Sequence, residues 1–158
     1  MRKVVVNTTP IIALADIGYL VLLKQLYGKI IIPEAVDREI LSEPARRLVN
    51  EADWIQVEKV NNPNQKSLFS SRLHAGEVEV IMLGQECSAD LLIIDDNAAK
   101  KTAKYLNLTV TGTIGVLLKA KREGFIPAVR PLMENLISDG FYVSQVVQDY
   151  ALKQAGEK

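Results

Sequence analysis

The chain has almost none of the side chains on which disulfide and soft-metal chemistry depend. Its 158 residues include one cysteine, Cys87, and one histidine, His74. A single cysteine excludes an internal disulfide and a cysteine-based zinc site, and a single histidine excludes a site built from several imidazoles. Any metal that the chain binds must therefore be held mostly by oxygen atoms.

The chain also lacks an excess of either charge. Lys and Arg together number 19, as do Asp and Glu, so the formal net charge is zero. This balance excludes a polybasic nucleic-acid coat and a disordered acidic tail. It leaves nucleic acid open as a substrate, because a local basic patch fits within a neutral total. With 48% hydrophobic residues, the length suits one domain over residues 1–158.

No long hydrophobic run is present. The β-branched run at residues 3–6 stops at Asn7-Thr8-Thr9-Pro10, too early for a signal peptide. The apolar stretch at residues 11–23 contains Asp16 and Gly18 and is too short to span a bilayer. We therefore expect a soluble, cytoplasmic protein that makes no contact with a membrane.

Short apolar runs alternate with stretches of helical period. The expected strands are residues 3–6, 29–32, 54–60, 91–94 and 108–110. The expected helices are residues 11–15, 19–27, 33–41, 44–51, 73–87, 98–106, 114–122, 128–138 and 144–154. Thr9 is expected to cap the first helix, with Pro10 at its first position. The alternation predicts an α/β fold, a three-layer α/β/α sandwich with a mainly parallel central sheet. The helices from about residue 127 onward are expected to pack on this domain or on a partner chain.

Three of the expected strands end in polar turns that lead directly into helices. These turns are Asn7-Thr8-Thr9, Asp95-Asp96-Asn97 and Thr111-Gly112-Thr113. Parallel sheets place their sites beyond the carboxyl ends of the strands, although each turn alone is explained by an ordinary helix cap. Asp95 and Asp96 are less ordinary, because a cap needs one carboxylate and two adjacent carboxylates repel each other. A nearby cation would relieve that repulsion.

Glu77 is the most informative single residue. Its neighbours at helical spacing are apolar: Leu73, Val80 and Ile81. Glu79 falls on roughly the opposite face of the same helix. A carboxylate that faces the core needs a hydrogen-bond partner, a cation or a proton. Glu77 therefore either pairs with a basic residue or a backbone amide, or lines a site. The adjacent Gly76 favours the site, because it permits close approach.

Glu39 lies at the margin of the apolar face of its helix, and on its own it would be assigned to the surface. Together with Glu77, the Asp95-Asp96 pair and the amide oxygen of Asn7, it makes an oxygen donor set that favours Mg²⁺ or Mn²⁺. Such a cation suits phosphoryl transfer. Lys100 belongs to a basic group on the helix after Asp96. This group could bind a polyanion, and the alternative is that it forms an ordinary solvated helix face.

Five segments resemble the PIN domain, a family of small metal-dependent ribonucleases, and most closely a PIN-like branch of prokaryotic proteins related to toxin-type ribonucleases. The segments are VVVNTTPIIALADIGYL, IIIPEAVDREI, LHAGEVEVIML, LLIIDDNAAKKTAKYLNL and TGTIGVLLKAK. Their order and spacing together are specific, and they cover about the first three quarters of the chain.

The resemblance implies a set of catalytic residues. Asn7 stands where the family usually has an aspartate, and it offers a carbonyl oxygen without a negative charge. The family's other acids correspond to Glu39, Glu77 and Asp96, with Asp95 as the alternative register. Glu39, Glu77, Asp96 and Asn7 are the implied metal ligands. The expected substrate contacts are Thr8, Thr111, Thr113 and Lys100.

The resemblance therefore implies a Mg²⁺- or Mn²⁺-dependent ribonuclease acting on single-stranded or structured RNA. Its expected partners are RNA, a small antitoxin protein and a second copy of the chain in a homodimer. One alternative is a PIN-like module that binds RNA or protein without cleaving, which Asn7 supports. A receiver-like signalling domain is disfavoured, because receivers carry an acidic pair after the first strand, where this chain has Asn7-Thr8.

Overall fold

Five strands form one parallel sheet in the order β3-β2-β1-β4-β5. The computed structural model describes residues 2–69 and 71–157. The strands are β1 (Val4–Val6), β2 (Ile30–Pro33), β3 (Ile55–Glu58), β4 (Leu91–Ile93) and β5 (Val110–Thr111). The α-helices are α1 (Thr8–Asp16), α2 (Val21–Tyr27), α3 (Glu34–Glu39), α4 (Ala45–Glu51), α5 (Ala75–Glu86), α6 (Asn97–Tyr105), α7 (Thr113–Arg122), α8 (Arg130–Ser138) and α9 (Gln145–Gln154); η1 (Pro63–Leu68) is a 3₁₀ helix.

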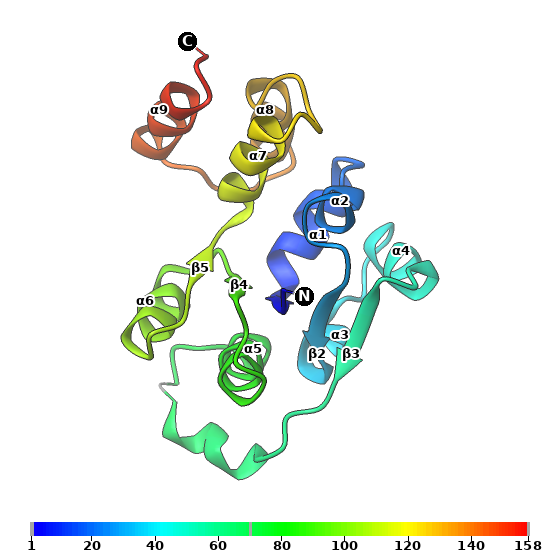
Figure 1. Ribbon diagram of the computed structural model, residues 1–158, viewed down its shortest axis with the longest axis vertical. Coiled ribbons are helices and arrows are strands. Elements are labelled where there is room, and N and C mark those ends of the chain that lie inside the picture. Colours follow the sequence, from blue (N-terminus) through cyan, green and yellow to red (C-terminus); the bar gives the residue numbers. More distant parts are fainter. Residues whose placement is uncertain (1, 70, 158) are drawn as a thin grey trace.

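The helices form layers on both sides of this sheet. Figure 1 shows α1, α2 and α7 on one side and α5 and α6 on the other. The short helix α3 packs against α5 at the carboxyl end of β2. The expected three-layer α/β/α sandwich with a parallel central sheet is therefore confirmed.

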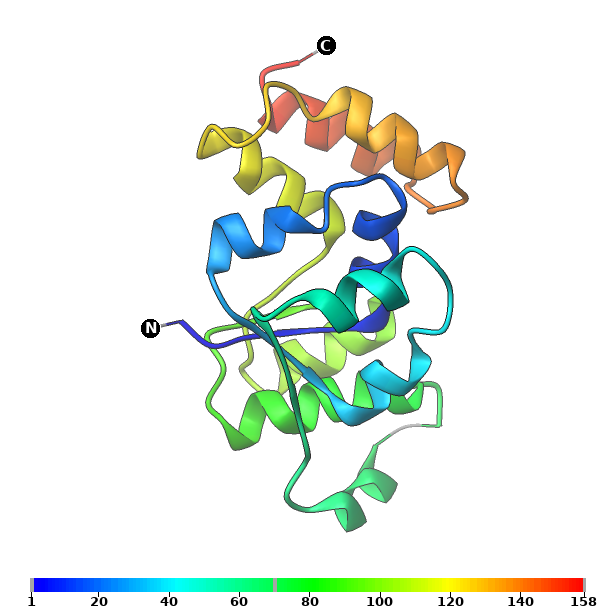
Figure 2. The ribbon, with the colours of Figure 1, turned by 90° about the vertical axis from the view of Figure 1, so that its right-hand side faces the viewer.

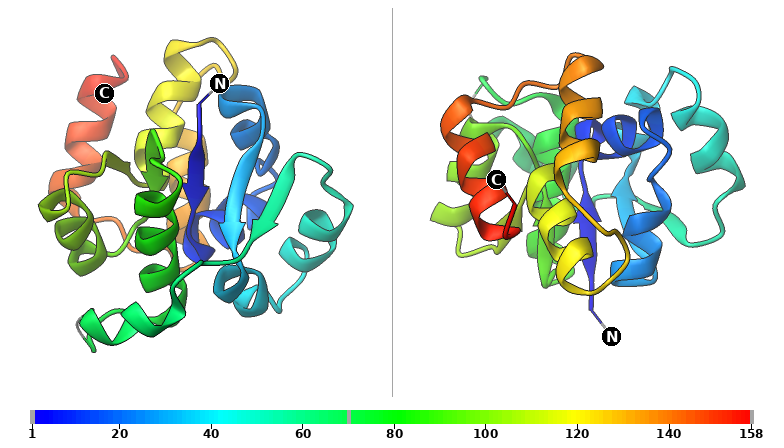
Figure 3. Two further views of the ribbon diagram at one scale, coloured as in Figure 1. Left: turned by 60° about the horizontal axis from the view of Figure 1, so that its bottom comes forward. Right: turned by 90° about the horizontal axis from the view of Figure 1, so that it is seen from above.

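The strand order contains a reversal beside β1. From β1 the chain moves outward through β2 to β3, and then crosses to the other side of β1 to form β4 and β5. Val5 pairs with Ile31 on one side and with Leu92 on the other, so β1 is central (Figure 3). In open parallel sheets, ligands bind outside the carboxyl ends of the strands at such a reversal. The fold therefore predicts a site at the ends of β1 and β4.

The central strands are apolar because helices cover both faces of the sheet. All three residues of β1 are fully buried, and Ile30, Ile32 and Ile93 are buried equally completely. Within the described residues, no single helix is long and apolar enough to cross a membrane. In the same part of the chain, the helices α1 and α2 taken as a pair meet that length and composition, with a bend of 117° between them.

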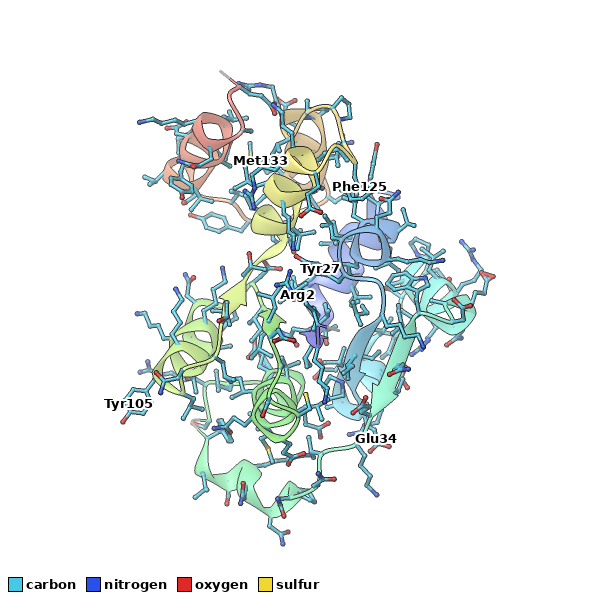
Figure 4. All side chains as sticks on the ribbon, viewed as in Figure 1. Arg2, Tyr27, Glu34, Tyr105, Phe125 and Met133 are labelled. Carbon is cyan, nitrogen blue, oxygen red and sulfur yellow. The ribbon has the colours of Figure 1, made fainter. Side chains whose placement is uncertain are left out.

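The helices α8 and α9 lie beside α7, at one end of the molecule (Figure 2). Met133, which is labelled in Figure 4, is 2% exposed in this region, and Ala151 is fully buried. Glu157, which follows α9, connects this helix to α7 and to the start of α8. It accepts hydrogen bonds from the Lys121 side chain and from the backbone amide of Val129. The C-terminal helices thus share a core with the rest of the domain.

The first helix begins earlier than the sequence predicts. It starts at Thr8, so Asn7 occupies the cap position and Pro10 is the third residue of the helix. Thr9 is therefore not the cap. Asn7 occupies the cap position without a side-chain hydrogen bond to the helix, so capping does not set this start. The earlier start is compatible with Pro10, because proline fits anywhere in a first turn whose amides have no helical partner. The other expected helices and strands lie within a few residues of their predicted positions, whereas the 3₁₀ helix η1 was not expected from the sequence.

Candidate functional site

The carboxyl ends of β1 and β4 lie side by side and bring together residues that are far apart in the sequence. The backbone amide of Asn7 donates a hydrogen bond to the carbonyl oxygen of Ile93 at 3.0 Å, so the two segments of backbone stay paired past the end of β1. The first turns of α1, α5, α6 and α7 follow or face these strand ends. Helix N-termini favour negative charge, which suits the carboxylates gathered here.

Glu39 is fixed from two sides. It is the last residue of α3, and its Oε1 accepts a hydrogen bond from the Thr8 hydroxyl at 2.5 Å. Its Oε2 accepts a second bond from the backbone amide of Gly76 at 3.1 Å. A Cβ atom at position 76 would overlap the Glu39 carboxylate, so this approach requires glycine. The structure thus places Glu39 beside the starts of α1 and α5.

Glu77 is buried, with 7% of its surface exposed, and it both accepts a backbone hydrogen bond and lies near other acids. Its Oε1 accepts a hydrogen bond from the backbone amide of His74 at 2.9 Å, as a helix cap does. Burial raises the pKa of Glu77, the His74 amide opposes that rise, and the charges of Asp96 and Glu39 raise the pKa further. Glu77 therefore caps a backbone amide and also faces two other acids.

The adjacent acids Asp95 and Asp96 point to different neighbours. Asp96 is exposed and caps α6, where its Oδ2 accepts from the Ala99 amide at 2.9 Å. Asp95 accepts two 2.7 Å hydrogen bonds from Thr113, one from the backbone amide and one from the hydroxyl. Burial raises the pKa of Asp95, although the Thr113 hydrogen bonds and the charge of Lys100 oppose it. Asp96 is thus the member of the pair whose charge acts on Glu77.

Asn7 carries a polar atom that lacks a partner. The residue is 4% exposed, and among the described residues nothing donates a hydrogen bond to its buried Oδ1. Leaving a buried carbonyl oxygen unpaired costs about 1–3 kcal/mol. A cation at this strand end would satisfy that oxygen.

The four expected substrate contacts differ in their accessibility. Thr8 uses its hydroxyl to hold Glu39. Thr113 is fully buried and bonded to Asp95, so it positions that acid and does not face a substrate, contrary to the expectation. Thr111 is half-buried, with its hydroxyl packed beside Gly115. Lys100 is half-buried and places its ammonium group over Gly112, close to Asp95. Of the four, Lys100 is best placed for an anionic group.

The donor atoms suit a hard divalent cation. Within residues 2–69 and 71–157, no three His, Cys, Asp or Glu side chains already surround a single point. Mg²⁺ does not require such a cage, because it keeps several waters and is usually held by one or two carboxylates. The unpaired oxygen of Asn7, together with the carboxylates of Glu77, Asp96 and Glu39, meets that need.

One buried acid near the site was not singled out from the sequence. Glu79 is 2% exposed, and its Oε1 accepts a hydrogen bond from the Ala35 amide at 2.9 Å. Its Oε2 forms an ion pair with Lys66 of η1. The helical wheel correctly puts Glu79 opposite Glu77, but the sequence does not reveal that α3 and η1 contact that face as well. The signal that was available is a second glutamate within a helix that is apolar on nearly every side.

A comparison with protein families identifies the family of the chain. A family model described as the PIN domain matches residues 3–157, which is nearly the whole chain. No curated protein matches the chain significantly. PIN domains have a nuclease-type fold and generally use divalent metal ions. The resemblance read from the five sequence segments is confirmed, and the chain belongs to the PIN domain family.

Proposed function

We propose that the protein is a Mg²⁺- or Mn²⁺-dependent endoribonuclease whose metal is held by Glu39, Glu77, Asp96 and Asn7. The observation that carries the proposal is the unpaired, buried oxygen of Asn7 at the strand reversal where three carboxylates gather. A donor set made only of oxygens suits these two ions.

A divalent cation bound at this site supplies positive charge that lowers the pKa of a water molecule and stabilises negative charge on a phosphodiester. The protein's own groups prepare the site for it. Thr8 and Gly76 hold the Glu39 carboxylate in place, and the His74 amide orients Glu77. Asp95 fixes the first turn of α7 through Thr113 and supports the site from outside.

RNA is the substrate class that the surroundings support best. Lys100 lies beside Asp95, at the same sheet edge as the carboxylates, and its ammonium group suits a phosphate of the RNA backbone. The positive ends of α1, α5, α6 and α7 at this edge add to the attraction for phosphate groups.

Cleavage assays test this function. Purified wild-type protein should cut single-stranded or structured RNA only when Mg²⁺ or Mn²⁺ is present, and Glu77→Gln should abolish cleavage while leaving the fold intact. Lys101→Gln, which changes an exposed cation on the outer part of α6, is the matched control and should cleave as the wild type does. Cleavage by Glu77→Gln at the wild-type rate would refute the assignment.

The alternative is a PIN domain that binds RNA or protein without cleaving it. The absence of a charge at Asn7 favours this alternative, since a neutral ligand binds a cation less tightly than a carboxylate does. Calorimetry with Mn²⁺ separates the two, because a degenerate site should release little or no heat.

We also propose that the protein is the toxin of a toxin–antitoxin pair and acts as a cytoplasmic homodimer. The support is the likeness of the five sequence segments to toxin-type PIN ribonucleases. Co-expression with the product of the neighbouring gene tests it: a small protein that co-purifies and suppresses cleavage supports the pairing. Sedimentation of the purified chain as a monomer at micromolar concentration would rule out the homodimer.

A further inference from the structure

Two glutamates bind the starts of each other's helices. Glu39 of α3 accepts a hydrogen bond from Gly76, the second residue of α5. Glu79 of α5 accepts a hydrogen bond from Ala35, the second residue of α3. The two pairings connect α3 and α5 at both ends of their contact, so a shift of one helix along the other would break both bonds.

The helix α3 needs this support because it cannot cap itself. It has six residues, and Pro33 at its cap position provides no side-chain acceptor. The first amides of a helix have no partner within the helix, and so short a helix is not stable alone. Glu79 supplies the missing acceptor from α5, at 2.9 Å from the Ala35 amide.

The charge of Glu79 is balanced from outside the site. Lys66 of η1 contacts Oε2 of Glu79, and the guanidinium group of Arg38 lies 3.9 Å from the same oxygen. Only 3% of the Glu79 side chain is exposed, and a buried carboxylate without a counter-ion would be strongly destabilising. These contacts hold Oε2 of Glu79, while Oε1 accepts the hydrogen bond from the Ala35 amide of α3. Glu34, labelled in Figure 4, marks the end of α3 that Glu79 holds.

We infer that Glu79 is a positioning residue for the metal site. Through Ala35 it holds α3 at the position from which Glu39 reaches both Thr8 and Gly76. Glu79 touches neither metal nor substrate, and its effect is transmitted by α3. This inference rests on the proposed function, which makes Glu39 a metal ligand.

Two variants of Glu79 separate positioning from burial. Glu79→Gln keeps a carbonyl oxygen for the Ala35 amide, whereas Glu79→Met fills the same space without an acceptor. Mn²⁺ affinity, measured by calorimetry on the folded protein, should fall about 10-fold or more in Glu79→Met, which is the usual effect of losing a group that orients a ligand. It should stay close to the wild-type value in Glu79→Gln.

A distant core variant controls for loss of stability. Met133→Ala, in α8, should lower the urea midpoint of unfolding without changing Mn²⁺ affinity. Unchanged Mn²⁺ affinity in Glu79→Met would overturn the positioning role and leave the proposed function standing. An equal loss of affinity in Met133→Ala would also overturn it. Absence of Mn²⁺ binding by the wild type would refute the proposed function and this inference with it.

A double-mutant cycle tests whether Glu79 acts through Glu39. In a Glu39→Gln background, Glu79→Met should weaken Mn²⁺ binding much less than it does alone, because the group that it positions has already been altered. Fully additive losses would overturn the mechanism.

The wild-type protein provides a measurement that needs no variant of Glu79. If α3 and the metal site are coupled, the coupling is reciprocal, so Mn²⁺ should slow hydrogen exchange at the Ala35 amide more than at the Met133 amide. An Ala35 exchange rate that Mn²⁺ leaves unchanged would contradict the inference, even if Glu79→Met fails to fold.

Discussion

The backbone amide of Gly76 lies 3.1 Å from Oε2 of Glu39, closer than any side chain at position 76 would permit. This contact joins two segments that are 37 residues apart. It also places the Glu39 carboxylate next to Glu77, since Gly76 and Glu77 are adjacent. The site is therefore sensitive to small changes in volume at the start of α5.

Gly76→Ala should disturb the site more than the fold. The added methyl group would displace the Glu39 carboxylate, so we expect Mn²⁺ affinity and RNA cleavage to fall at least about 10-fold. Gly84→Ala in the same helix is the matched control, because its methyl group would meet Leu92 in the core. That variant should lose stability by about 1–3 kcal/mol and keep its metal affinity. Equal metal affinities in the two variants would contradict the role of Glu39.

Asn7→Asp should lower the stability of the metal-free protein and raise its affinity for a divalent cation. Asn7 pairs with Ile93 at the end of β4 and precedes Thr8, whose hydroxyl holds Glu39. A carboxylate at this position would add repulsion in the metal-free protein and attraction for a divalent cation. We expect a lower midpoint of urea unfolding without metal, and tighter Mn²⁺ binding with equal or faster RNA cleavage. A variant that is less stable and also binds Mn²⁺ more weakly would show that Asn7 does not face the metal.

Substitutions of the two adjacent aspartates should have different effects, one on metal binding and the other on stability. Asp96→Asn removes a charge that acts on Glu77, so it should weaken Mn²⁺ binding and slow cleavage. Asp95→Asn alters the acceptor of the two Thr113 bonds, so its main effect should be a loss of about 1–3 kcal/mol in the free energy of unfolding. The reverse pattern would assign the metal to Asp95.

Glu157 predicts a pH dependence of stability that is independent of the metal site. Burial alone would raise its pKa, but hydrogen bonds from Lys121, Val129 and Arg130 outweigh burial and lower the pKa to about 2. Because the folded-state pKa is lowered, this contribution is present above the ordinary value of 4.5 and is lost as the pH falls toward 2. Glu157→Gln should cost about 1.5–3 kcal/mol at pH 7 and almost nothing near pH 2. Urea unfolding of both proteins across this range measures the difference.

The sequence allowed the strand ends to be predicted because a parallel sheet gathers them by geometry. Asn7 and Asp95 each follow a buried strand, and no tertiary contact is needed to expect them at one edge. Glu77 was predictable because it interrupts an apolar helix face. The placement of Glu39 was not, since six residues of helix are too few to define a buried face, and its contact partner Gly76 lies far along the chain.

The contact partners of Glu79 and the burial of Thr113 could not be predicted from the pattern of residues. The helical wheel assigns Glu79 a direction but not a neighbour, and its burial depends on Lys66 and α3. The resemblance implied that Thr113 contacts the substrate, whereas the structure buries this residue against Asp95. Both differences come from contacts between segments whose relative placement is set by the fold alone.

We propose that one divalent cation is held at the ends of β1 and β4 by a carboxylate set that includes Glu77. Calorimetric titration of the metal-free protein with Mn²⁺ tests this most directly, with Glu77→Gln titrated in parallel. We expect one Mn²⁺ per chain in the wild type and an affinity at least about 10-fold lower in Glu77→Gln. Equal Mn²⁺ binding by the two proteins, or none by the wild type, would contradict it.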